Sequence, residues 1–350
     1  NGALLLEPSR QQLIQFSEYF GSSAWIKTSI SVTPNSIASP DGYTNAYLFT
    51  TNNPAGTVYR AYNNSTGGTN ATNTISAFFK YGNHPYAYIT GDSAGLGNFG
   101  IFNIQNGTIE TTSAGYTATI TPYSNGWYRC TLTGTIDSAN NIQFGLTAST
   151  TSYAGTSLPD GKTMYCWGAM REYNATYATS YIPNHSGTGG VTRAADTCSV
   201  TGVSDVIGQT EGTLFYDWIM NHESPNTSED LYTLVLSDGT NNKLIGINNY
   251  NNFLGIFIKD TTTQFYNSSY TGGEDGARIK LAIAYANNDV ALYMNGTQIA
   301  TDSSATIPTL NQITLNSYWS GNLVDSTSVN QLALFNERLT NAELATLTTL

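Results

Sequence analysis

Short strand-like segments, each ended by a turn, recur along the chain at intervals of roughly ten to fifteen residues. The turns carry dipeptides such as Asn106-Gly107, Asn125-Gly126 and Asn295-Gly296, whose residues adopt a positive φ at low cost. Helical periodicity is almost absent. The chain is therefore predicted to be all-β, built from antiparallel β-sandwiches of the jelly-roll kind. The segments lie at residues 25–32, 75–81, 86–90, 99–104, 116–122, 127–132, 142–146, 164–171, 212–220, 231–237, 244–248, 254–259, 279–285, 290–294, 299–301 and 313–316.

Two domains are expected because 350 residues exceed what one hydrophobic core usually supports. The composition is 40% apolar and 12% aromatic, which is enough to build two cores. A loop-like stretch at residues 183–190 interrupts the strand pattern. We place the boundary shortly after it, which gives domains at residues 1–200 and 201–350.

The end of the chain differs from the rest in predicting a helix. Thr340-Asn341-Ala342-Glu343 fits a capping box, in which the Thr340 hydroxyl and the Glu343 carboxylate each accept a backbone N–H. Leu344 and Leu347 follow on one face. A short C-terminal helix is therefore expected to close the second domain.

The net charge of −11 is concentrated in the second half, where residues 201–350 carry five Lys or Arg and fifteen Asp or Glu. Neither half has the basic surface that nucleic acid requires, so no nucleic-acid partner is expected, and anionic membrane surfaces are disfavoured for the same reason. Neutral glycans and other proteins remain possible partners. No run of about 18 apolar residues is present, so no membrane insertion is expected.

Cysteines and chain ends give little functional information. The three cysteines, Cys130, Cys166 and Cys198, are an odd number without a C-x-x-C pair, and we interpret Cys130 and Cys166 as small core residues. The chain begins at Asn1 without an initiator Met, which suggests a fragment or a processed product.

The sequence lacks the usual signatures of catalysis. Glycoside hydrolysis needs two carboxylates fixed on rigid elements, and the spacing Glu-x-Asp-x-x-Glu does not occur. The acidic residues Glu223, Glu229 and Asp230 lie in a loop-like stretch beside His222. No nucleophile elbow, phosphate-binding loop or dinucleotide fingerprint is present. We therefore predict that the chain is not a stand-alone enzyme.

Aromatic residues flanked by amides are the best candidates for a binding site. A sugar ring packs its C–H face on Tyr or Trp, and neighbouring Asn side chains bond its hydroxyl groups. Tyr250 lies between Asn249 and Asn251, and Tyr318-Trp319 has Asn residues nearby. The predicted glycan site therefore consists of Asn249, Tyr250, Asn251, Tyr318 and Trp319. Tyr250 could equally be a turn aromatic or an oligomer contact. By contrast, Trp25, Trp127, Trp167 and Trp218 lie within strand segments and are predicted to be core residues.

Ordered motifs in the first half resemble a carbohydrate-binding-module-like jelly roll that is common in bacteriophage tail and fibre proteins. Gln11-Gln12 and Met170 depart from the family pattern, which has Thr-Asn and Gln there. The motifs are Leu4-Leu5-Leu6-Glu7-Pro8-Ser9-Arg10, Phe16-Ser17, Trp25, Ala38-Ser39-Pro40-Asp41-Gly42, Gly126-Trp127-Tyr128-Arg129, Trp167-Gly168-Ala169 and Ala178-Thr179-Ser180-Tyr181-Ile182-Pro183.

A second motif set resembles the laminin-G or concanavalin-A-like sandwich over residues 205–350. It comprises Ile283-Ala284-Tyr285, Leu292-Tyr293-Met294-Asn295-Gly296-Thr297 and Leu334-Phe335-Asn336-Glu337-Arg338-Leu339-Thr340-Asn341-Ala342-Glu343. Both resembled folds often hold structural calcium, which implies Glu7, Asp41 and Asp196 as candidate ligands. No other cofactor is expected.

These resemblances imply a virion protein, such as a tail fibre, spike or head fibre, which recognises glycans of the host cell surface weakly and multivalently for host attachment. Its expected partners are those glycans, other virion proteins and further copies of itself in a homotrimer, and its expected location is the surface of the particle. Two alternatives remain. One is a secreted polysaccharide lyase or glycoside hydrolase, or the accessory binding modules of such an enzyme. The other is a purely structural virion protein.

Overall fold

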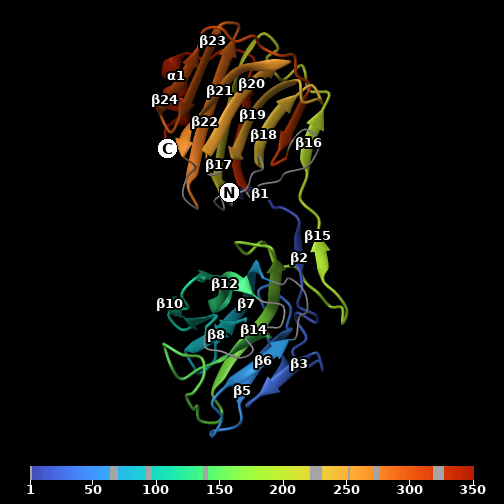
Figure 1. Cartoon of the computed structure of the whole chain (residues 1–350), viewed down its shortest axis with the longest axis vertical. Helices are drawn as coiled ribbons and strands as arrows, with labels where there is room; N and C mark the ends of the chain where they lie inside the picture. The colour runs from blue at the N-terminus through green and yellow to red at the C-terminus, as the bar shows by residue number, and fades with distance from the viewer. Residues whose placement is uncertain are drawn as a thin grey trace. The chain divides into compact units, whose positions relative to one another are not determined.

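The computed structural model divides the chain into two compact units (Figure 1). The N-terminal unit is residues 10–193, and the C-terminal unit joins residues 1–9 to residues 194–350. The structure describes residues 2–63, 70–91, 97–136, 141–220, 231–250, 253–271, 276–317 and 327–350, without the side chains of 231, 250 and 269–271. The strands pair antiparallel, and one short α-helix lies near the C-terminus, so the all-β sandwich prediction is confirmed.

Two sheets form the N-terminal unit. The first has the strand order β10-β9-β8-β13-β6-β3, and the second has the order β11-β12-β7-β14-β2-β15, with β5 beside β14 and β4 beside β5. The strands are β2 (Arg10–Gln12), β3 (Trp25–Thr28), β4 (Ile30–Ile37), β5 (Ala46–Thr51), β6 (Tyr59–Asn63), β7 (Ala71–Tyr81), β8 (Tyr86–Thr90), β9 (Phe99–Asn103), β10 (Thr108–Thr112), β11 (Thr117–Pro122), β12 (Trp127–Ile136), β13 (Ile142–Leu146), β14 (Thr163–Tyr173) and β15 (Val191–Arg193).

The core of the N-terminal unit lies between its two sheets. Alternate residues of β7, including Ile75 and Phe79, meet Trp25 and Phe144 of the opposite sheet there. Burial of such apolar side chains between two sheets is the main source of stability in a sandwich. All four tryptophans predicted to be core residues are buried, and so are Cys130 and Cys166, whose thiol pKa values are raised by that burial.

Two sheets also form the C-terminal unit, in the orders β1-β26-β17-β22-β23-β24 and β16-β25-β18-β19-β20-β21. We call them the helix-side sheet and the open sheet. Their strands are β1 (Leu4–Leu6), β16 (Cys198–Thr201), β17 (Glu211–Met220), β18 (Leu231–Ser237), β19 (Lys243–Tyr250), β20 (Phe253–Asp260), β21 (Thr262–Thr271), β22 (Arg278–Ala286), β23 (Asp289–Met294), β24 (Thr297–Asp302), β25 (Gln312–Leu315) and β26 (Thr327–Phe335).

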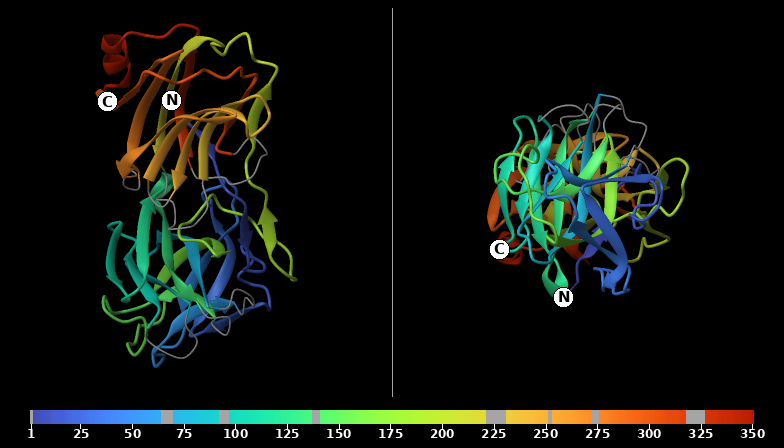
Figure 2. Two further views of the ribbon diagram at one scale, coloured as in Figure 1. Left: turned by 45° about the horizontal axis from the view of Figure 1, so that its top comes forward. Right: turned by 90° about the horizontal axis from the view of Figure 1, so that it is seen from below.

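The C-terminal helix α1 (Asn341–Thr348) packs on the outer face of the helix-side sheet (Figures 1 and 2). Its Leu344 contacts the small outward-facing residues Ala282, Ala284 and Ala291, while the residues between them point into the sandwich core. The predicted capping box is present: Glu343 N–H donates to Thr340 Oγ1 at 3.3 Å, and Thr340 N–H donates to Glu343 Oε2 at 2.8 Å. The helix therefore closes the second sandwich by covering one face of a sheet.

The first nine residues belong to the C-terminal unit, which differs from the expected boundary at residue 200. Strand β1 pairs antiparallel with β26, and the buried Leu6 joins the core of this unit. Glu7 and Asp196 are joined by two 2.9 Å bonds, one from Glu7 N–H to Asp196 Oδ2 and one from Asp196 N–H to Glu7 O. The N-terminal unit is therefore inserted between β1 and the rest of the C-terminal unit. In the described part of the chain, no helix is long and apolar enough to span a membrane.

This insertion predicts that Leu6→Ala destabilises the C-terminal unit, although residue 6 lies near the start of the chain. Leu6 is 4% exposed, so its truncation leaves a cavity and costs about 2–4 kcal/mol. Leu5→Ala is the matched control, because Leu5 is 44% exposed and its loss costs less than about 1 kcal/mol. Amide hydrogen exchange read peptide by peptide should show faster exchange in β17 and β22 of the Leu6 variant. Faster exchange in β7 and β14 instead would contradict the assignment.

Candidate functional site

The structure describes part of the predicted glycan site. Asn251, Tyr318 and Trp319 lie outside the described residues, and Tyr250 is the last residue of β19, without a described side chain. Asn249 is fully buried, with its Nδ2 at 3.8 Å from Met220 Sδ. Because successive side chains of a strand point to opposite faces, Asn249 points inward and Asn248 outward. Of these two residues, Asn248 therefore lies on the outer face of β19, and the glycan site predicted from the sequence stays a prediction.

A groove on the outer face of the open sheet is the candidate functional site. It has a volume of about 410 Å³ and lies on the side of the sandwich opposite α1. Its lining combines three aromatic rings with amide, hydroxyl and ammonium groups. The lining residues are Tyr232, Asn241, Leu244, Asn248, Phe257, Lys259, Thr263 and Tyr266. We call this feature the open-sheet groove.

Strand register brings these residues together from four neighbouring segments. Phe257 of β20 pairs with Tyr266 of β21, and Lys259 pairs with Leu244 of β19. On the other side, Asn248 pairs with Tyr232 of β18. Direct cross-strand partners have Cβ atoms about 5 Å apart, so their side chains form one continuous surface.

Two glycines let the larger side chains lie close against the sheet. Gly246 pairs with Phe257, and a Cβ at position 246 would overlap the Phe257 ring. Gly255 pairs with Asn248, and a Cβ there would overlap the Asn248 carboxamide. Glycine within a strand often marks such a close approach. The groove therefore has a floor of bare backbone on which one ring and one amide lie.

Turn chemistry holds the polar end of the groove. In the β18–β19 turn, Asp238 Oδ1 accepts the Thr240 N–H at 2.9 Å, and Gly239 has a φ of 87°. This turn presents Asn241, whose Oδ1 accepts from Lys259 Nζ at 3.4 Å. The groove thus has an aromatic middle and a polar end with an ammonium group.

The edge-to-face contact of Tyr232 with Phe257 fixes the aromatic part of the groove. Their ring centroids are 6.1 Å apart with an interplanar angle of 86°. Tyr266, which lies beside Phe257, is 56% exposed and presents its ring to solvent. Such an arrangement can receive the C–H face of a sugar on exposed aromatic surface while amides bond its hydroxyl groups.

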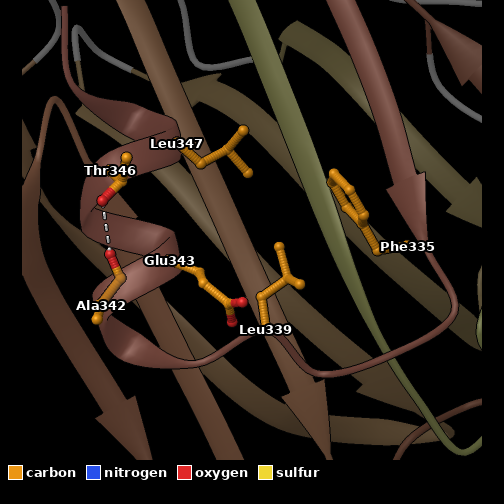
Figure 3. A pocket seen from close by; sticks show the side chains of 6 residues that line it. All are labelled: Phe335, Leu339, Ala342, Glu343, Thr346 and Leu347. Carbon is orange, nitrogen blue, oxygen red and sulfur yellow. Dashed lines mark hydrogen bonds between the residues drawn. The ribbon is translucent and has the colours of Figure 1, made fainter.

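A second hollow lies between α1 and β26 and has a different chemistry (Figure 3). Phe335, Leu339 and Leu347 give it an apolar wall, and its volume is about 440 Å³. Glu343 lies at its edge, but its carboxylate is used in the capping box, where the bonds to Thr340 lower its pKa. The hollow therefore offers apolar contact, without the convergent polar groups of the open-sheet groove.

The two described histidines lie in the N-terminal unit and have structural contacts. His84 is buried, with Nε2 at 2.7 Å from Thr147 O, and burial lowers its pKa. His185 Nε2 lies 3.3 Å from Glu18 Oε1, which also accepts from the Tyr181 hydroxyl at 3.2 Å. These contacts connect the segment at residues 181–185 to the start of the unit. His222, Glu223, Glu229 and Asp230 lie outside the described residues.

The three candidate calcium ligands lie in two different units, and calcium binding by them stays a prediction. Glu7 and Asp196 contact each other through a backbone N–H, and Asp41 belongs to the other unit. The carboxylate of Asp41 accepts from Tyr43 N–H at 2.9 Å and from Asn45 Nδ2 at 3.2 Å, which stabilises its own turn. Calcium takes six to eight oxygen ligands. Among the described residues, no three His, Cys, Asp or Glu side chains are grouped as metal ligands.

No protein-family model matches the chain, and no curated protein matches it. The CBM40 of the Ruminococcus gnavus IT-sialidase matches 43% of this chain and 96% of its own, with 15% identity and a TM-score of 0.35. The NanB sialidase from Streptococcus pneumoniae matches at 17% identity and a TM-score of 0.36, and the match covers 43% of this chain and 27% of that protein. The botulinum neurotoxin serotype D binding domain matches 43% of this chain and 39% of its own, at 11% identity and a TM-score of 0.34. Likenesses this distant identify neither a family nor a function.

The groove geometry predicts an energetic coupling between Gly246 and Phe257. Gly246→Ala should destabilise the protein by about 1–3 kcal/mol, because the added methyl group displaces the Phe257 ring. In the background of Phe257→Ala, the same glycine substitution should cost clearly less, since the overlap is gone. Urea unfolding of the four proteins gives this double-mutant cycle. Equal costs in both backgrounds would show that the ring does not lie over the glycine.

Proposed function

We propose that this chain is a structural and receptor-binding protein of a virion, such as a tail fibre, spike or head fibre, and that its C-terminal unit binds host surface glycans at the open-sheet groove. One observation carries the glycan part: rings and amides converge on a bare glycine floor, on the sandwich face that α1 leaves uncovered. The virion part is supported by the resemblance of the first motif set to the jelly roll that is common in phage tail and fibre proteins. Weak binding at one groove becomes useful when many copies act together on one cell surface.

The groove suits recognition without turnover. Its walls come from paired strands, so its rings are held before a ligand arrives and little conformational entropy is lost on binding. In the described part of the chain, no carboxylate lines the groove, whereas glycoside hydrolysis would require a pair of them. These features favour a binding module over a hydrolase at this position.

Aromatic truncation in the groove should weaken glycan binding. Tyr266→Ala removes the exposed ring and Phe257→Ala removes the ring beside it, and each is expected to reduce affinity about tenfold, the effect of losing about 1–2 kcal/mol of stacking. Tyr43→Ala is the matched control, because Tyr43 is 73% exposed and lies in the other unit. A polysaccharide array followed by calorimetry on the best ligand measures the effect. If the control loses as much binding as the groove variants, the groove is not the site.

Copy number gives a further test of the virion proposal. We expect a homotrimer, and multi-angle light scattering should then give about three times the chain mass of 37.7 kDa. Binding to a densely glycosylated surface should exceed binding to the free oligosaccharide, because the sites act together. A mass equal to that of one chain at every concentration would count against a fibre or spike.

A further inference from the structure

Among the described residues that line the open-sheet groove, Lys259 is the only charged one, although the surrounding unit is acidic. Residues 201–350 carry fifteen acidic and five basic residues. On charge alone such a unit repels anions. A cation placed in the ligand groove of an acidic unit therefore needs an explanation.

Lys259 differs from the other four basic residues of this region in the groups that lie near its cationic side-chain nitrogen. Arg278 forms a bidentate pair with Asp217, at 2.9 and 2.6 Å, and Arg338 Nη2 lies 2.9 Å from Asp289 Oδ1.

The two other lysines are engaged as well. Lys243 Nζ lies 3.6 Å from Asp260 Oδ1, and Lys280 Nζ donates to Thr349 O at 2.7 Å. In the described part of the chain, Lys259 reaches only the neutral Oδ1 of Asn241, at 3.4 Å. An ammonium group has three N–H donors, so Lys259 keeps donors for a further acceptor.

The place of Lys259 on β20 matches the size of one sugar unit. Lys259 and Phe257 are two residues apart on one strand, so they share a face and lie about 7 Å apart along it. A sugar ring stacked on the Phe257 and Tyr266 rings would therefore place a substituent at the Lys259 ammonium. Thr263, the cross-strand partner of Lys259, adds a hydroxyl group there.

We infer that the open-sheet groove prefers an acidic glycan, with the sugar ring on Phe257 and Tyr266 and the anionic group of that sugar on Lys259. This inference rests on the proposed glycan function and assigns its ligand class. The anionic group is a carboxylate or a sulfate, and both pair with an ammonium group through charge-assisted hydrogen bonds. The acidic surroundings keep other polyanions away, so the preference requires the aromatic contact as well.

The test compares one acidic polymer with its neutral form of the same backbone, and adds a sulfated polymer that carries the second kind of anionic group. Polygalacturonate, its carboxyl-reduced neutral form and a sulfated galactan are titrated into the whole chain and into two variants. Lys259→Gln removes the charge and keeps a polar side chain that is one atom shorter. Lys243→Gln is the control, because Lys243 is paired with Asp260 and does not line the groove.

We expect the unmodified chain to bind one of the acidic polymers at least tenfold more tightly than the neutral form, and Lys259→Gln to lose most of that difference. The affinity of Lys259→Gln for the neutral form should stay within about twofold, and Lys243→Gln should behave as the unmodified chain. Raising the salt concentration should weaken acidic binding only where Lys259 is present, since ions screen this pair. The two acidic polymers distinguish a carboxylate from a sulfate.

The possible failures separate the two proposals. Equal binding of neutral and acidic polymers, with the loss in Tyr266→Ala retained, would overturn the acidic preference and leave the glycan groove intact. A preference for acidic polymers that survives in Lys259→Gln would place the anion elsewhere and overturn the role of Lys259. Binding to none of the polymers and to no glycan on the array would overturn the groove function together with this inference.

Discussion

The two outer faces of the C-terminal sandwich are under different constraints because only one of them has a helix to cover it. The inner faces of the two sheets share a core, so each outer face must either pack against another element or be compatible with water. On the helix-side sheet, Ala282, Ala284 and Ala291 are small enough for α1 to approach closely. On the open sheet, rings and amides occupy the corresponding surface. The position of the candidate site follows from this asymmetry.

Two glycines of the open sheet let the side chains of its outer face lie close to the backbone. Full-sized side chains at positions 246 and 255 would raise the Phe257 ring and the Asn248 amide away from the backbone. Glycine weakens a strand by roughly 0.5–1 kcal/mol relative to alanine, so one glycine in each of the neighbouring strands β19 and β20 lowers the stability of the sheet. The neighbouring β strands and the core beneath offset that cost. What the unit gains is a groove whose walls are already in place before a ligand binds, which is the usual requirement of a specific binding surface.

Local sequence patterns predicted the local features of this fold well. The turn glycines at 107, 126 and 296, the capping box at Thr340 and the four core tryptophans each depend on residues close in sequence or on hydrophobicity alone. The partner of β1 could not be predicted, because Leu4–Leu6 pairs with a strand more than three hundred residues away and any sheet edge could have received it. The groove could not be assembled either, since its residues become neighbours only through the register of β18 to β21.

Asn248 and Asn249 show that sequence alone does not tell which of two neighbouring strand residues faces outward. A shift of one residue exchanges the two faces of a strand. The bulge between Tyr232 and Leu234 shifts the pairing register between β18 and β19, and no residue pattern in that segment predicts it.

Charge shows the same division between overall and local properties. The acidic balance of residues 201–350 suggested neutral ligands, because summed charge governs what approaches a surface from afar. At contact distance the sum matters less, since ions screen exposed charges beyond about 8 Å at physiological salt. There the contacts of each charged group decide: among the described residues, Arg278 pairs with Asp217, whereas Lys259 contacts only an amide oxygen. A unit can therefore be acidic overall and still present a positive charge to a ligand in its groove. The sequence contains both lysines and their charges, but only the strand register distinguishes the paired Lys243 from the available Lys259.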